Sequence, residues 1–254
     1  MIRRIKACLN GGRAVDEHPA LPSSPAELAE AAAGAAAAGA EAVHIHPRDA
    51  EGVESLAAAD IGAAVAAVRA RCPGLPVGVS TGLWMTRGDV ALRQATVAGW
   101  ARLPAEQRPD LASVNASEGG FAELVAALGE TGVVAEAGVW SADEAEVLNG
   151  VPVGRILVEV LQTPAADAVA AAKRILDRLD KLGLAGPRLL HGEEAACWPL
   201  IRYAGQLGLP TRIGLEDTLV TDDGFPAADN ADLVRRALDV WTGQRAWTGQ
   251  PERR

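Results

Sequence analysis

Short apolar runs alternate along the whole chain with longer segments that are rich in alanine and charged residues. Short apolar runs bounded by turn residues are typical of buried strands, and longer segments with apolar residues at helical spacing are typical of helices that cover a sheet. The predicted strands cover residues 5–9, 42–46, 76–80, 111–114, 132–135, 155–160, 188–190 and 211–215. The predicted helices cover residues 25–39, 56–71, 86–101, 121–128, a segment that begins at 141, 163–182, 195–207 and 231–241.

Eight repeats of strand and helix joined by short turns predict a (β/α)8 barrel, also called a TIM barrel. A length of 254 residues suits one such domain, residues 1–254, with a tail from about residue 243. A doubly wound open sheet is the alternative. However, residues 10–13 read Asn-Gly-Gly-Arg and lack the G-x-G-x-x-G spacing that holds a dinucleotide. In a barrel, polar residues at the carboxyl ends of the strands share one rim.

Charge and composition exclude several classes of partner. The formal net charge of -9 provides no positive field for nucleic acid, and no apolar run approaches the roughly 18 residues of a membrane span. The apolar stretch after the basic N-terminus breaks at residues 10–12, too soon for a signal peptide. The three scattered cysteines indicate neither a disulfide framework nor a thiolate zinc site. We therefore expect a soluble cytoplasmic protein that binds neither nucleic acid nor membranes.

Two of the four histidines, His44 and His46, end the second predicted strand. Alternate residues of a strand share a face, so both imidazoles can reach one metal ion. Strand eight lies beside strand one in a closed barrel, which brings Glu216 toward them, although a carboxylate there is also a common helix N-cap. Two imidazoles and one carboxylate make the usual ligand set of a catalytic zinc site, and iron or manganese accepts the same ligands.

Asp217 and Arg212 flank this ligand set in the sequence. If the turn after strand eight aims Asp217 back over the rim, that carboxylate can act as a general base or can orient a metal ligand. A guanidinium at position 212 that faces the interior needs Asp217 or a bound substrate as its partner, whereas one that faces outward meets a helix.

Ser80, Thr81 and Asn115 also lie at predicted strand ends, either as donors to a substrate carboxylate or as turn caps. Residues 78–82 match G-x-S-x-G, and His191 follows them in the chain. A serine hydrolase is therefore a minor alternative, because the chain offers no clear aspartate to complete the required order of partners.

Taken in order, these motifs resemble those of the β-keto acid cleavage enzyme family over nearly the whole length of the chain. The segments that carry the resemblance are residues 7–11, 19–22, 44–49, 78–82, 113–115 and 214–217. The resemblance implies a (β/α)8 barrel whose Zn²⁺ is held by His44, His46 and Glu216. It also implies a reaction in which a β-keto acid and acetyl-CoA give acetoacetate and a new CoA ester.

The same resemblance implies roles for individual residues. Asp217 is expected to be the base, and Arg212 its charged neighbour. Ser80 joins them as a catalytic residue and binds the substrate carboxylate together with Thr81. The other substrate-binding residues expected from this comparison are Gly82, Ser113, Asn115 and Glu136.

Several departures from the family's pattern concern the substrates. The chain passes from strand six into the next helix without the family's long glycine-rich loop near CoA, which weakens the prediction of acetyl-CoA as co-substrate. Gly138 and Arg13 replace acidic residues of the founding member, which favours a neutral or anionic β-keto acid over a cationic one. Glu159, His191 and Glu193 receive no role.

Two other functions stay open at this point. One is a zinc-dependent hydrolase or aldolase that acts on a small keto acid without CoA, and the other is a non-catalytic metal-binding barrel. The resemblance also predicts a homo-oligomer, for which Trp241 and Trp247 near the C-terminus offer a docking surface.

Overall fold

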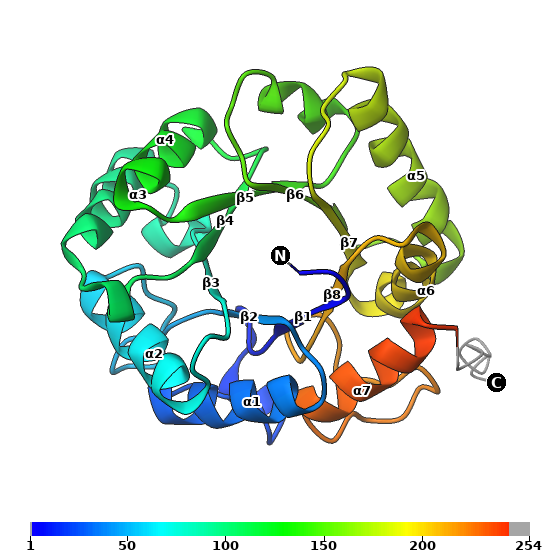
Figure 1. The fold of residues 1–254 in the computed structure, drawn as a ribbon, viewed down its shortest axis with the longest axis horizontal. Coiled ribbons are helices and arrows are strands. Elements are labelled where there is room, and N and C mark those ends of the chain that lie inside the picture. The colour runs from blue at the N-terminus through cyan, green and yellow to red at the C-terminus, as the bar shows by residue number, and fades with distance from the viewer. Residues whose placement is uncertain (1, 244–254) are drawn as a thin grey trace.

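The computed structural model describes residues 2–243, where eight parallel strands form a ring that seven α-helices surround (Figure 1). The strands are β1 Ile5–Cys8, β2 Ala42–Ile45, β3 Val77–Ser80, β4 Leu111–Asn115, β5 Val134–Val139, β6 Arg155–Val160, β7 Arg188–Gly192 and β8 Thr211–Ile213. The helices are α1 Pro25–Ala37, α2 Ala58–Arg71, α3 Val90–Ala98, α4 Phe121–Thr131, α5 Ala165–Lys181, α6 Cys197–Leu207 and α7 Asn230–Trp241.

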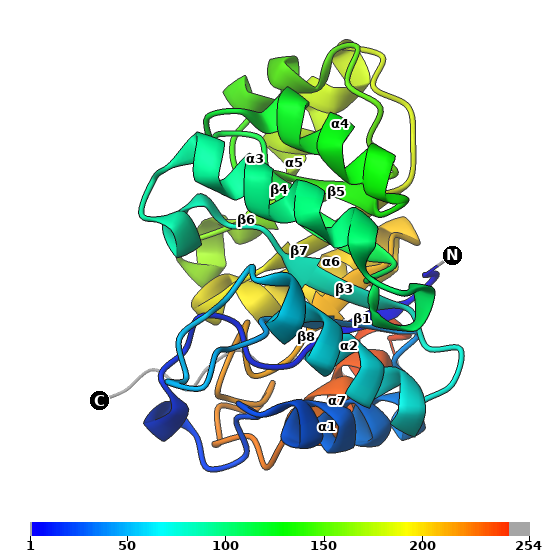
Figure 2. The same cartoon turned by 90° about the vertical axis from the view of Figure 1, so that its left-hand side faces the viewer.

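The strands follow one another around the ring, in the order β7-β6-β5-β4-β3-β2-β1-β8. The gap between β7 and β8 is bridged by a hydrogen bond from the Leu190 N–H to the Pro210 carbonyl, 3.0 Å long. The side view in Figure 2 shows the helices stacked outside the strands, with α1, α2 and α7 together on one side. The predicted (β/α)8 barrel is confirmed.

Two predicted elements differ from the structure. The helix expected to begin at residue 141 is only a short 3-10 helix, Asp143–Leu148. Strand five lies later than predicted, at Val134–Val139, because Glu136 is an interior position of the strand and does not end it. Elsewhere the boundaries shift by a few residues, as at α3, which begins after its Asp89 cap instead of at residue 86.

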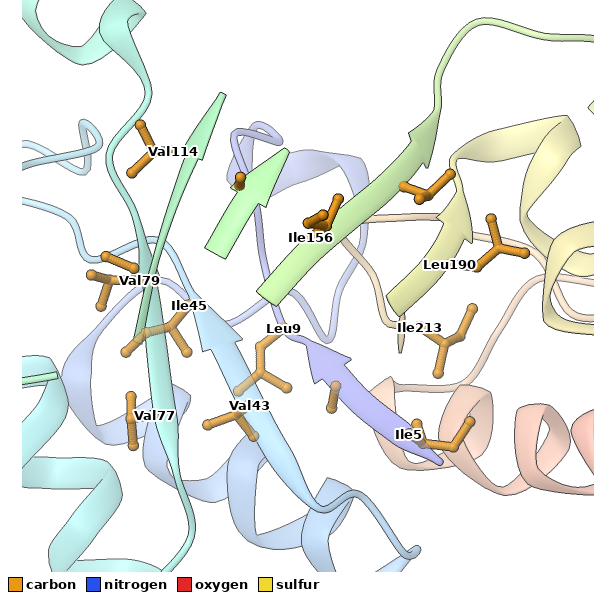
Figure 3. Packing of buried hydrophobic residues seen from close by; sticks show 14 of the residues in the cluster. Ile5, Leu9, Val43, Ile45, Val77, Val79, Val114, Ile156, Leu190 and Ile213 are labelled. Atoms are coloured by element: carbon orange, nitrogen blue, oxygen red, sulfur yellow. The ribbon is translucent and has the colours of Figure 1, made fainter. Parts of the chain in front are cut away.

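The apolar core lies between the strands and the helices. Ile5, Val43, Val79 and Ile213 all point out of the ring into this layer and are fully buried (Figure 3). Since alternate strand residues face opposite ways, the residues between them point into the ring. These inward positions include Lys6, His44 and Arg212, so the lumen of this barrel is polar.

No helix among residues 2–243 combines the length and apolar character needed to cross a bilayer. Trp241, expected at a docking surface, donates its indole N–H to the Leu209 carbonyl at 2.8 Å and is partly buried against the end of α6. Trp247 and the rest of the predicted tail beyond residue 243 lie outside the described residues.

Candidate metal centre and active site

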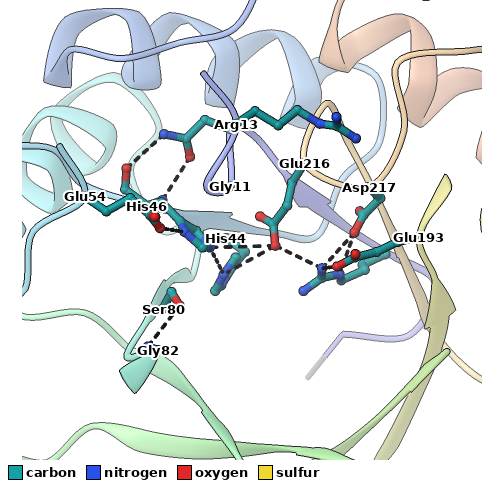
Figure 4. A network of polar contacts seen from close by, with 12 residues as sticks. Gly11, Arg13, His44, His46, Glu54, Ser80, Gly82, Glu193, Glu216 and Asp217 are labelled. Atoms are coloured by element: carbon teal, nitrogen blue, oxygen red, sulfur yellow. Dashed lines mark hydrogen bonds and ion pairs between the residues drawn. The ribbon is translucent and has the colours of Figure 1, made fainter. Parts of the chain in front are cut away.

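His44, His46 and Glu216 converge at the carboxyl ends of β2 and β8 (Figure 4). The two histidine Nε2 atoms lie 3.1 Å apart, and Glu216 Oε1 lies 3.9 Å from the first and 3.7 Å from the second. The imidazoles are almost completely buried and the carboxylate is nearly so, which removes most competing water. The structure thus brings together the three side chains that the sequence predicts as metal ligands.

The donor set fits a divalent zinc ion. Tetrahedral zinc with bonds of about 2.0–2.1 Å to nitrogen holds two such nitrogens roughly 3.3 Å apart, close to the separation of the two Nε2 atoms. Glu216 Oε2 is buried without a hydrogen-bond partner among the described residues, so the carboxylate has one free oxygen for a cation. Burying an unpaired carboxylate oxygen is costly, and a bound cation would remove that cost.

The loop after β1 helps to position His46 and Glu216. Asn10 donates its side-chain N–H to the His46 carbonyl and accepts the His46 backbone N–H, both at 2.9 Å. Gly11 has a φ of +57°, and a Cβ there would lie 2.5 Å from Glu216 Cγ. Only glycine meets both conditions, so the predicted turn at residues 10–12 allows Glu216 to approach the histidines.

Arg212 faces the interior and contacts both carboxylates that follow β8. Its Nε donates to Asp217 Oδ1 at 2.9 Å, and its Nη2 donates to Glu216 Oε1 at the same distance. Burial raises the pKa of Asp217 well above its usual range, with Arg212 opposing the shift. Burial acts to lower the pKa of Arg212, but Asp217, Glu216 and the other acidic neighbours together raise it well above its usual value, so the guanidinium stays charged. The pair combines a fixed cation with a carboxylate suited to accept a proton.

On β3, the predicted carboxylate binders have partners within the protein. Ser80 Oγ accepts the Gly82 N–H at 3.3 Å, and the Thr81 hydroxyl donates to the Ser113 carbonyl at 2.6 Å. Thr81 is fully buried, so its hydroxyl ties β3 to β4, whereas Ser80 retains a hydroxyl proton to donate. Gly82 leaves room for the Trp84 indole, which a Cβ at this position would approach to 2.1 Å.

Asn115 and Glu136 also have protein partners. Asn115 donates to Glu118 at 2.9 Å, and Ser113, the other residue predicted on β4, is half-buried. Glu136 is fully buried, where it pairs with Lys6 and accepts from Arg155 at 2.7 Å. Both of its oxygens are therefore engaged below the candidate metal ligands, and a direct role in substrate binding has no support from these contacts.

A second buried cluster lies on β6 and β7. His191 Nε2 lies 3.3 Å from Glu159 Oε1, and Trp140 donates its indole N–H to Glu159 Oε2 at 2.8 Å. Burial lowers the pKa of His191 to about 4. Although burial opposes it, the pairing with His191 lowers the pKa of Glu159 to about 2. His191 lies on the strand across the ring from Ser80 and faces this carboxylate, so the serine hydrolase alternative lacks a nucleophile–base pair.

Sequence reasoning missed three residues near the ligands: Asn10, Lys6 and Glu54. Lys6 was detectable in principle, because it alternates with apolar neighbours in a strand and must then point into the ring. Glu54 lies in an irregular loop, where no periodicity predicts which way a side chain points. It accepts a hydrogen bond from His46 Nδ1 at 2.5 Å.

Comparisons with known proteins agree with this architecture. A family model described as beta-keto acid cleavage enzyme matches residues 4–245. The solved binary complex of ObcA with oxaloacetate has a TM-score of 0.71 and 17% identity, and the match covers 89% of this chain and 64% of ObcA. The ternary complex of ObcA with a C4-CoA adduct and oxalate has a TM-score of 0.70 and 19% identity, and the match covers 89% of this chain and 64% of that chain. The chain thus spans less than two thirds of ObcA.

A 3-dehydroquinate dehydratase from Geobacillus kaustophilus HTA426 has a TM-score of 0.58 and 11% identity, covering 83% of this chain and 81% of that one. At such identities these likenesses show the fold alone. The comparison with curated proteins finds no match.

Proposed function

Because the chain belongs to the beta-keto acid cleavage enzyme family, we propose that it converts a β-keto acid and acetyl-CoA into acetoacetate and a new CoA ester. The observation that carries the proposal is the convergence of a three-ligand metal site with the Asp217–Arg212 pair on one rim. The ObcA complexes hold oxaloacetate and a CoA adduct, which supports a keto acid and a CoA thioester as the partners.

His44, His46 and Glu216 would hold the metal, for which we propose zinc. When bound, such an ion supplies Lewis acidity that withdraws electrons from the keto acid's oxygens and makes the carbon between its two carbonyls more acidic. Ser80 would donate its hydroxyl proton to the substrate carboxylate. Thr81, Ser113 and Asn115 would shape the surrounding wall through the contacts described above.

Asp217 would remove one proton from the carbon between the carbonyls, and Arg212 would keep the resulting charges balanced. That carbon attacks the acetyl thioester and the CoA thiolate leaves. The thiolate then attacks the original keto carbonyl, and the adjacent carbon–carbon bond breaks. Asp217 returns its proton to the departing carbon, which gives acetoacetate and the new CoA ester.

The test is incubation of the purified, zinc-loaded protein with a panel of β-keto acids and acetyl-CoA, with acetoacetate measured over time. We expect acetoacetate from at least one neutral or anionic member of the panel, and its loss in the His44→Ala protein. Absence of acetoacetate from every keto acid would contradict the proposal.

A keto acid hydrolase or aldolase that works without CoA is the second candidate. The observation in its favour is the short connection from β6, which ends at Val160, to α5, which begins at Ala165. Turnover of a keto acid without any thioester would select this alternative. The predicted homo-oligomer also stays a proposal, which the mass of the protein in solution tests.

A further inference from the structure

The two histidine ligands are held in different ways. His44 Nδ1 is buried without a hydrogen-bond partner among the described residues. His46 Nδ1, in contrast, is bonded to Glu54 Oε1. An imidazole nitrogen that donates its proton to a carboxylate leaves the other nitrogen as the lone-pair donor, so this bond selects Nε2 of His46 as the metal-binding atom.

Glu54 is itself held in place from its other side. Its Oε2 accepts the indole N–H of Trp84 at 3.0 Å, which leaves Oε1 for His46. The Trp84 ring stacks on the His46 ring with centroids 6.5 Å apart and planes at 21°. Trp84 thus fixes the carboxylate through a hydrogen bond and the imidazole through its face.

Two glycines make this arrangement possible. A Cβ at Gly12 would lie 3.1 Å from Glu54 Oε2, and a Cβ at Gly82 would lie 2.1 Å from the Trp84 ring. A side chain at position 82 would displace the indole, and one at position 12 would press on the Glu54 carboxylate and force it to shift slightly. Loops after β1, β2 and β3 therefore combine to orient one ligand, and Figure 4 shows its contact with Glu54.

We propose that Glu54 is a positioning residue, assisted by Trp84, that presents Nε2 of His46 to the metal. This inference rests on the metal site of the proposed function. In this role Glu54 orients the His46 ring and increases the basicity of its Nε2, and it does not contact the substrate.

The experiment measures the affinity of the full-length protein for Zn²⁺ in competition with a chelator, and the visible spectrum of the Co²⁺-substituted protein. We expect Glu54→Ala to weaken zinc binding by about 10- to 100-fold and to alter the Co²⁺ spectrum. Glu54→Gln, which keeps an acceptor without its charge, should fall between Glu54→Ala and the unaltered protein. Glu51→Gln is the matched control, since Glu51 is an exposed glutamate of the same loop.

Trp84→Phe keeps an aromatic face but removes the N–H, so it should lower the affinity for zinc less than Glu54→Ala does. This variant also tests the proposal if Glu54→Ala does not fold. Nitrogen NMR of the metal-free protein gives a readout that a merely structural role would not move, because it reports whether His46 carries its proton on Nδ1.

The possible outcomes separate the two proposals. If the unaltered protein binds zinc and all Glu54 variants bind it equally well, the positioning role is wrong while the metal site stands. If the unaltered protein binds no zinc, both proposals fall.

Discussion

At the scale of single residues, the site combines groups whose charge states are set by their neighbours. Asp217 and Arg212 touch each other in a region from which water is almost excluded, and burial acts on both. A carboxylate that is hard to keep ionised is a better proton acceptor than an exposed one. The catalytic prediction for Asp217 follows from this environment.

Replacing Asp217 with asparagine keeps the shape but removes the proton acceptor. We expect kcat to fall by about 10²- to 10⁴-fold, while zinc content stays unchanged because Asp217 is not among the three proposed ligands. Steady-state kinetics with the keto acid found in the panel, together with metal analysis, measures both quantities. Asp16→Asn is the control, since Asp16 is an exposed aspartate. An active Asp217→Asn protein would remove Asp217 from the mechanism.

Glu193 gives a prediction for pH. Burial raises its pKa to about 7, above the usual 4.5. Between the pKa of the unfolded chain and that of the folded protein, Glu193 is protonated more in the folded protein. The free energy of unfolding therefore falls as the pH rises between these two pKa values. Glu193→Gln lacks the effect, and its Tm should gain on that of the unaltered protein between pH 5 and pH 8. The gain should be small, because the Glu193 side chain is 38% exposed and partly screened. A difference in Tm between the two proteins that does not change with pH would contradict this prediction.

At the scale of elements, the start of a helix could be predicted best where its capping residues are neighbours in the sequence. Ser24, Pro25 and Glu27 predicted the start of a helix, and α1 begins there with the Ser24 side chain accepting the Glu27 N–H. The segment after residue 141 carried a similar signal but makes only a 3-10 helix. Its serine donates to Glu144 at 3.2 Å and caps no backbone N–H.

The cap of α1 is open to a direct measurement. Ser24→Ala should lower the free energy of unfolding by about 1 kcal/mol, because one backbone N–H of the first turn loses its acceptor. Denaturant unfolding gives this number. Ser23→Ala serves for comparison, since within residues 2–243 the Ser23 hydroxyl bonds only the Glu27 side chain. Equal stability of all three proteins would show that water replaces the cap at no cost.

The residues around the ligands show where sequence reasoning ends. Strand periodicity places His44 and His46 on one face, and barrel closure brings Glu216 to them. Nothing local indicates that Glu54 turns back to His46 or that Glu136 bonds Lys6 instead of a substrate. Those pairings join positions 8 and 130 residues apart, and depend on where loops and opposite strands come together.

At the scale of the whole molecule, a buried ion cluster spans the barrel beneath the candidate metal ligands. Glu136 on β5 pairs with Lys6 on β1, across the ring, and with Arg155 on β6. Lys6 is two residues before Cys8, the partner of His44 in the β1–β2 register, so this cluster lies one layer deeper than the ligands. Glu136 is the counterion of both buried cations, so both lose their partner when its charge is removed.

Glu136→Gln should therefore destabilise the protein by about 3–5 kcal/mol, because two buried cations lose their counterion. Replacing all three groups with apolar residues of similar volume should cost much less than the single change. Denaturant unfolding distinguishes the two variants. If Glu136→Gln folds normally but raises KM, the earlier expectation that Glu136 binds substrate would regain support.

The order of the ligands along the chain has a consequence for assembly. His44 and His46 lie in the first fifth of the polypeptide and Glu216 in its last fifth. A fragment that lacks either end therefore does not contain all three proposed ligands. An ion bound by all three side chains would hold the ends of β2 and β8 together. Its uptake by a refolding chain would therefore report that the barrel has closed.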